Sequence, residues 1–336
     1  MAYVLQRLAF SVLSLIVLLL ITFVLSHVVP GDPAIVAAGP NAGAEKIGQV
    51  REEMGLNEPL WTQFAIYVGK LAQGDLGTSW FTFQPIAQDL ARELPPSLEL
   101  VAVAMLINLA VSLPLGLLTA RYNGTRFDDV VRVLAMAGAG LPVFWTAILL
   151  QQSVAADWKL FPVAGRLSFE NRDFEGATGF TLVDSLVAGR PDIFADAVAH
   201  LFLPALALSL LFTAVGVRIT RTAMISEFRK DYVLLARAKG AGEARVMARH
   251  VFPNGATPSL TVFGMQFGWM LGATVLVEEI FGRPGIGRYA VKAVTQSDIH
   301  AVVAVVLVVG LVFLLANLAV DILLYVLSPR IRSESA

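Results

Sequence analysis

The residues of this chain that could do chemistry are few and scattered. The chain has no cysteine, which excludes disulfides, thiolate catalysis and cysteine metal ligands. It also lacks the HExxH zinc helix, the GxSxG nucleophile turn and the GxxxxGK[ST] phosphate loop, so no catalytic centre of those kinds is expected. The four histidines lie near edges of apolar segments and far apart in sequence, so we expect no shared metal site. These histidines are His27, His200, His250 and His300.

A glycine-rich stretch at residues 278–288 superficially resembles an anion-binding loop. It follows an apolar helical segment rather than a strand, so a dinucleotide site is not expected there. We interpret it as a tight turn at a membrane edge whose carboxylates are solvated or paired with Arg283 and Arg288. A gating role is the alternative hypothesis. The residues assigned to this turn or gate are Glu278, Glu279, Phe281, Pro284, Gly285 and Gly287.

Two polar residues, Asn317 and Asp321, lie four positions apart and therefore on one face of the last apolar segment. Polar groups in such a segment are costly unless they face protein or water. A proton relay would need further titratable groups, whereas the other apolar segments offer mainly neutral amides. We therefore interpret the pair as a polar clasp between helices.

The most informative segment is residues 231–253, DYVLLARAKGAGEARVMARHVFP. It is basic and predicts two short helices, 231–239 and 243–250, around a flexible turn containing Gly240 and Gly242. We expect helix to stop at Pro253, since proline is disfavoured inside a helix.

The first of these helices shows Tyr232, Leu235 and Ala236 on one face. A solvated connection or a patch for anionic lipid would account for the basic residues. A small-residue surface with a glycine pivot fits the groove of a partner protein better. We expect this contact surface to comprise Asp231, Tyr232, Leu235, Ala236, Arg237, Ala238, Lys239 and Gly240, with Gly242 and Pro253 belonging to the lever behind it.

The elements that must position these residues are membrane helices. Of the 336 residues, 56% are hydrophobic and 15% are charged, which is too little polar surface for a soluble protein. The net charge of −1 gives no basic field for nucleic acid. Six apolar runs have about the length that crosses a bilayer. They are 8–29, 98–120, 133–155, 201–217, 258–277 and 301–327.

The distribution of lysine and arginine predicts the orientation. These residues crowd the segments before the first run, after the second, after the fourth and after the last, so those sides are expected to be cytoplasmic. Both termini are then cytoplasmic, and residues 30–97 and 156–199 lie outside. In the third run, Gly138 to Pro142 predicts a kinked packing helix in preference to a hinge that lines a path.

Taken together, these segments resemble the permeases of ABC importers, in the form typical of the dipeptide/oligopeptide/nickel branch. The coupling loop of that family matches Ala236 to Gly240 with the spacing to Pro253. The resemblance covers almost the whole chain, and its order and spacing are specific. Further matching positions include Pro30–Pro33, Gly74–Ser79, Arg221, Pro284–Arg288, Asp298, Asn317 with Asp321, and Pro329–Arg330.

The resemblance implies an all-α polytopic protein with the type I importer fold and six transmembrane helices, in a prokaryotic plasma membrane. It implies the first permease subunit of an ATP-driven peptide importer, without catalysis or a cofactor of its own. The implied partners are a second homologous permease, two ABC ATPases that bind ATP and Mg²⁺, and an extracytoplasmic solute-binding protein. Nickel chelates, glutathione or haem are alternative cargoes, and an autonomous channel or membrane enzyme is the alternative class.

On this basis the chain is expected to have three parts. Residues 1–29 form the cytoplasmic N-terminus and first span, and residues 30–97 form an external cap. Residues 98–336 form a five-helix core with the external loop 156–199 and the cytoplasmic coupling loop 219–253. The sequence leaves the cargo, the resting conformation and the residues that touch substrate open.

Overall fold

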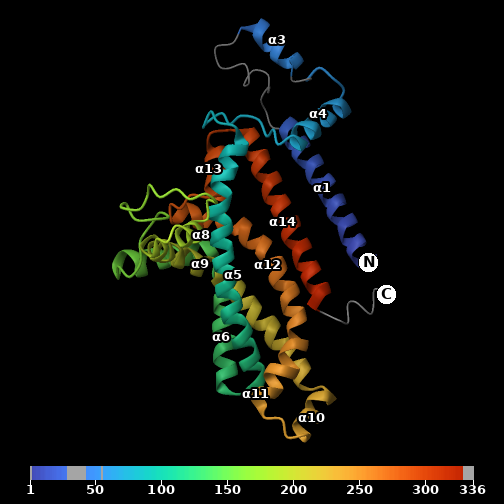
Figure 1. Ribbon diagram of the computed structural model, residues 1–336, viewed down its shortest axis with the longest axis vertical. Helices are drawn as coiled ribbons and strands as arrows, with labels where there is room; N and C mark the ends of the chain where they lie inside the picture. Colours follow the sequence, from blue (N-terminus) through green and yellow to red (C-terminus); the bar gives the residue numbers. More distant parts are fainter. Residues whose placement is uncertain (1, 29–42, 54–55, 328–336) are drawn as a thin grey trace. The chain divides into compact units, whose positions relative to one another are not determined.

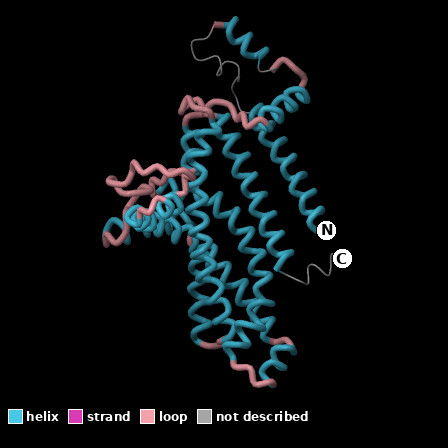
Figure 2. Tube along the Cα trace, viewed as in Figure 1, coloured by secondary structure: helices cyan, strands magenta, loops and turns pink. Residues whose placement is uncertain are grey.

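The computed structural model describes residues 2–28, 43–53 and 56–327. Side chains are described throughout these ranges except at residues 2–7, 25–28, 50, 53, 321 and 323–327. The described residues form helices joined by loops (Figure 2), so the predicted all-α architecture is confirmed. The motif at Pro30–Pro33 and the one at Pro329–Arg330 lie outside the described residues.

The chain divides into two compact units. One contains Arg92–Tyr289 with the two terminal segments, and the other contains Phe10–Ala91 with Ala290–Leu311. Helices labelled in Figure 1 include α1 (Ala2–Val28), α3 (Ala44–Glu53), α4 (Leu60–Ala72), α8 (Thr181–Val187) and α13 (Ile286–Thr295).

Four described helical segments are long and apolar enough to cross a membrane. A fifth span results if one bent helix pair is counted, while the apolar part of α1, Leu8–Val24, is shorter. The structure therefore supports a polytopic membrane protein with four or five candidate spans, against six predicted. The four long segments are α5 (Ile86–Arg121), α9 (Pro191–Phe228), the continuous helix Glu243–Ile280 and α14 (Ile299–Leu327, apolar over Ile299–Val320).

The bent pair corrects the prediction for the third span. Helix α6 (Arg126–Gly140) and the following helix α7 (Val143–Leu150), extended by a π-helical turn to Asp157, meet at an angle of 101°. Leu141 and Pro142 have extended backbone angles. The residue before a proline avoids the helical region, and Pro142 cannot donate the next helical hydrogen bond. The segment is thus broken rather than kinked.

Close packing joins the long helices of the first unit. A Cβ atom on Gly216 of α9 would lie 2.9 Å from side-chain atoms of Phe263 in α12 (Phe252–Ile280) and of Ser112 in α5. Asn108 of α5 donates to Gln266 at 2.7 Å, and Gln266 donates to the carbonyl of Phe212 at 3.1 Å. These two amide hydrogen bonds therefore link α5, α12 and α9 inside the bundle.

Candidate functional site

The segment 231–253 folds as two helices around a glycine turn, as predicted. Helix α10 covers Asp231–Ala238, helix α11 covers Glu243–Arg245, and a π-helical segment continues through Val246–Val251. Gly240 has a φ of +82°, where a side chain would be strained although the space beside it is open. Gly242 has a φ of −66° as the residue before α11, so of these two glycines it is Gly240 that occupies the left-handed region.

The helix does not stop at Pro253, contrary to expectation. Pro253 lies in the first turn of α12, and the helix runs without a break from Glu243 to Ile280. The π-helical turn just before Pro253 has a wider ring, which accommodates the missing donor and the bulk of the proline ring. The amide of Asn254 donates to the carbonyl of His250 at 2.7 Å. The second half of the loop is therefore directly continuous with a membrane helix.

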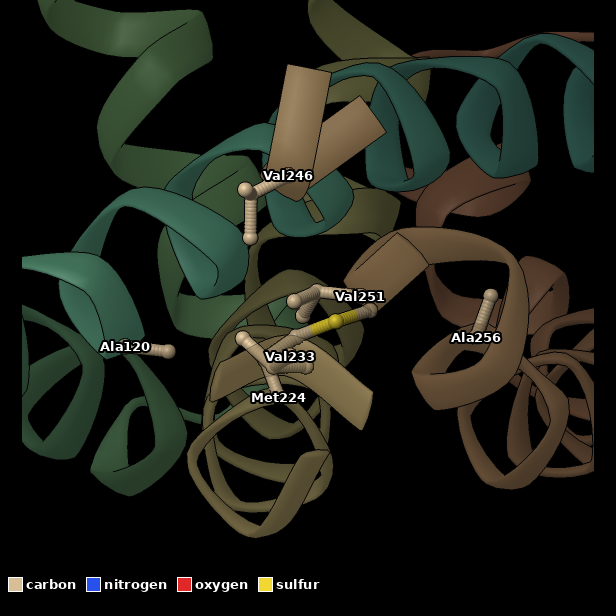
Figure 3. Packing of buried hydrophobic residues seen from close by; sticks show 6 residues of the cluster. All are labelled: Ala120, Met224, Val233, Val246, Val251 and Ala256. Carbon is tan, nitrogen blue, oxygen red and sulfur yellow. The ribbon is translucent and has the colours of Figure 1, made fainter. Parts of the chain in front are cut away.

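An apolar cluster anchors the loop to the ends of two other helices. Val233 of α10, Val246 and Val251 are fully buried and pack with Met224 of α9 and Ala120 of α5 (Figure 3). Burying a valine side chain contributes about 1.5–3 kcal/mol. Residues far apart in the sequence thus hold α10 and the π-helical segment against the ends of α5 and α9.

The predicted contact face is only partly exposed. Tyr232 is half-buried; its hydroxyl donates to Glu227 and lies 3.2 Å from the carbonyl oxygen of His250. Ala236 packs against the apolar cluster. Within the predicted contact surface, Tyr232 and Ala236 are therefore half-buried on the side of α10 that faces α9, whereas Leu235 is 55% exposed. The outward face comprises Asp231, Leu234, Leu235, Ala238, Lys239 and Gly240, of which Leu234 was missed.

One acidic residue ties the loop together. Glu243 accepts hydrogen bonds from Arg237 at 2.8 and 3.2 Å, and an arginine from the end of α5, Arg121, lies 3.1 Å away. All three side chains are 36–40% exposed. Arg237, which remains a predicted contact residue, thus also orients the two short helices. The sequence signal for Glu243 is an acid in the first turn of a helix that directly follows a glycine turn.

Beside the exposed leucines lies an open groove of about 430 Å³. Apolar and basic side chains both line it, which suits a partner surface that combines apolar and acidic groups. The residues that line it are Tyr232, Leu235, Ala236, Lys239, Gly240, Ala241, Arg245 and His250.

At the other end of α12, the glycine-rich stretch encloses a carboxylate. Glu278 is completely buried and accepts hydrogen bonds from Ser97 at 2.5 Å, from the N–H of Gly287 at 2.9 Å and from the N–H of Arg288 at 3.0 Å. A Cβ atom on Gly285 would collide with this carboxylate. The expectation of a solvated or arginine-paired Glu278 is wrong, because the glycines let the backbone itself bind the carboxylate.

The neighbouring residues of that turn behave differently. Glu279 is 51% exposed and lies 3.7 Å from Arg288, so the predicted pairing is confirmed for this carboxylate. Phe281 is buried and its carbonyl accepts from Gly165, while Pro284 is half-buried. The turn at residues 278–288 is therefore a packed clasp rather than a loose loop.

A second carboxylate, Glu99 of α5, fastens the same turn. Arg283 lies 2.9 Å from Glu99, Arg166 lies 3.3 Å from it, and the N–H of Leu182 donates to it at 2.8 Å. Burial lowers the pKa of the Arg283 guanidinium to about 10, against the opposing effect of Glu99, so Arg283 stays charged at neutral pH. No sequence pattern linked residue 99 to residue 283, because the link depends on the packing of α5 against the turn.

In the other unit, Asp298 is hydrogen-bonded to the end of the stretch Gly74–Ser79. Asp298 is completely buried and accepts from Ser79 at 2.7 Å, from the N–H of Trp80 at 2.6 Å and from the N–H of Ala301 at 3.0 Å. The last bond is that of an N-cap at the start of α14.

The structure describes the side chain of one member of the polar pair Asn317 and Asp321. Asn317 donates to the carbonyl of Phe313 in its own helix at 2.9 Å. The side chain of Asp321 lies outside the described residues. Within residues 2–28, 43–53 and 56–327, no group of three or more His, Cys, Asp or Glu side chains is placed to hold a metal ion.

The sequence of this chain matches known proteins over almost its whole length. Residues 112–333 match the family described as binding-protein-dependent transport system inner membrane component, and residues 1–100 match the N-terminal region described for such membrane components. The chain is 38% identical over 336 residues to the dipeptide transport system permease protein DppB of Escherichia coli, covering 99% of each chain.

Two further relatives show the same coverage. The chain is 36% identical over 334 residues to DppB of Alkalihalophilus pseudofirmus, covering 99% of each chain. It is 33% identical over 330 residues to the glutathione transport system permease protein GsiC of Salmonella choleraesuis, covering 98% of each chain. The chain is therefore a non-catalytic transport component of the inner membrane and belongs to the family of binding-protein-dependent transport system inner membrane components.

Proposed function

We propose that this chain is the first of two homologous permease subunits in an ATP-driven importer of peptides. The observation that carries the proposal is the anchored loop 231–253 with its outward leucine face, in a chain similar over its whole length to dipeptide permeases. The permease would have the type I importer fold with six spans and both termini in the cytoplasm. Its partners would be a second permease, two ABC ATPases that hold ATP and Mg²⁺, and a solute-binding protein.

The packing of the loop suggests how it would transmit force. The loop connects α9 directly to α12, and the valine cluster fixes it to the end of α5. A displacement of Leu234 and Leu235 by an ATPase would therefore move the ends of three helices together rather than bend a flexible connection. The closing and opening of the ATPases would in this way alternate the access of the pathway.

The external segments would receive the cargo. Residues 30–97 are proposed as the cap that meets the solute-binding protein, and the clasp around Glu278 would hold the outer ends of α5 and α12 together. Peptides are favoured as cargo because the dipeptide permeases are 36–38% identical to this chain. Glutathione is the second candidate, on the 33% identity to GsiC.

Purification from the native membrane with identification of the bound chains tests the proposed assembly. We expect a second permease and two ATPases to co-purify, and the reconstituted complex to take up a labelled dipeptide in an ATP-dependent manner when the solute-binding protein is added. Uptake by the purified chain alone would contradict the assembly. Uptake of glutathione but not of dipeptides would leave the assembly intact and overturn the cargo.

A further inference from the structure

A second groove, of about 410 Å³, lies between α6 and α9. Its walls are apolar, with Ala135, Met136 and Ala139 on α6 and Val215 on α9. Three arginines line it as well, Arg132 on α6 and Arg218 and Arg221 on α9. The groove therefore combines an apolar wall with a cluster of cationic groups.

Helices α6 and α9 form the two sides of this groove. A Cβ atom on Gly138 would touch that of Ala214 at 3.6 Å, so α6 and α9 approach closely at that level. Arg218 lies one helical turn, about 6 Å, beyond Ala214 towards the coupling loop. The arginines thus mark the end of the groove nearest to the coupling loop, and the apolar wall runs from there into the membrane-spanning part.

The three arginines of this groove differ in how fully their charges are paired. Arg221 is committed to Asp128 at 2.6 and 2.7 Å and to Asn123 at 2.8 Å. Arg132 has only an exposed contact with Asp129 at 3.4 Å, which contributes little. The guanidinium of Arg218 is exposed and forms no hydrogen bond or ion pair with any side chain in the described ranges. One positive charge thus remains uncompensated by these two carboxylates.

We propose that this groove binds one anionic phospholipid from the leaflet on the side of the coupling loop. The phosphate lies between Arg132 and Arg218, and the first methylenes of an acyl chain lie against Ala135, Met136 and Ala139. Guanidinium groups bind phosphate in a bidentate manner, and basic pockets between membrane helices favour lipid headgroups. A transported peptide could offer a carboxylate to the same arginines, but the apolar wall would leave its backbone groups unsatisfied.

Native mass spectrometry of the complete purified complex, titrated with phosphatidylglycerol, tests this site. Replacing Arg218 with glutamine should weaken phosphatidylglycerol binding about fivefold, and the double replacement Arg132→Gln with Arg218→Gln about 30-fold. Phosphatidylcholine with the same acyl chains should bind equally to all variants. Filling the groove with Ala135→Phe, which keeps every charge, should also reduce phosphatidylglycerol binding.

The matched control is Arg126→Gln, which removes the same charge from the start of α6 outside the groove. It should leave phosphatidylglycerol binding unchanged. Equal losses for Arg126→Gln and Arg218→Gln would show a general effect of charge and overturn the site. Unaltered binding in the double variant would overturn it as well. So would a specific crosslink from a cysteine at position 135 to the second permease, because the groove would then be an interface between subunits.

Discussion

The two ends of the continuous helix Glu243–Ile280 each combine a glycine turn with a carboxylate, but in opposite ways. In the loop 231–253, Glu243 is 40% exposed and pairs with arginine side chains. In the clasp at residues 278–288, Glu278 is completely buried and is held by Ser97 and by two backbone N–H groups. The carboxylate of the clasp is therefore bound entirely by groups of its own chain. The loop instead keeps an outward apolar face, while its valines are buried in the apolar cluster.

The largest expected effect is on stability, and it distinguishes Glu278 from the neighbouring Glu279. Glu278→Ala leaves a buried hydroxyl and two buried N–H groups without an acceptor, so we expect a loss of about 3–5 kcal/mol in the free energy of unfolding. Glu279→Ala removes only an exposed pair and should cost less than about 1 kcal/mol. Thermal unfolding of the purified complex measures both. Similar melting temperatures for the two variants would contradict the locked clasp.

The next prediction compares the two glycines of the coupling loop. Gly240→Val places a β-branched residue at a φ of +82°, which costs about 1–3 kcal/mol in backbone strain, so the turn should shift. We expect the variant to hydrolyse ATP while transporting several-fold less substrate per ATP. The measurement is the ratio of uptake to phosphate release in proteoliposomes.

Gly242→Val is the matched control, because its φ of −66° suits any residue and nothing lies within 4 Å of a Cβ atom there. It should keep the normal ratio. Gly240→Asn should recover most of the loss, since asparagine tolerates the left-handed region. Equal uncoupling by both valine variants would mean that side-chain bulk matters rather than backbone angle.

Local sequence patterns predicted the helices and the turn of residues 231–250. They did not predict which side chains contact one another between distant helices. The helix, turn and helix of residues 231–250 followed from local propensity and glycine, and the structure confirms them. The inward direction of Tyr232 and the burial of Glu278 depend on α9 and α5, which approach only in the folded chain. The π-helical turn before Pro253 likewise requires packing that outweighs a local rule.

The smallest expected effect concerns Glu243. Glu243→Gln removes its charge from contacts with Arg121 and Arg237, each exposed enough to contribute about 0.2–1 kcal/mol. We expect the complex to assemble with a nearly unchanged melting temperature and a modest fall in uptake per ATP. A loss of stability as large as that of Glu278→Ala would contradict the difference between the exposed Glu243 and the buried Glu278.

The central claim is that the outward face of α10 contacts an ATPase, and site-directed crosslinking tests it most directly. Because the chain contains no cysteine, Leu235→Cys introduces a single thiol at a position that is 55% exposed. In membranes that contain the whole complex, a short bifunctional thiol reagent should join this thiol to an ATPase subunit that carries single engineered cysteines on its surface. Val187→Cys, in the exposed end of α8, should give no such product. Crosslinking to an ATPase from position 187, or to none from position 235, would contradict the claim.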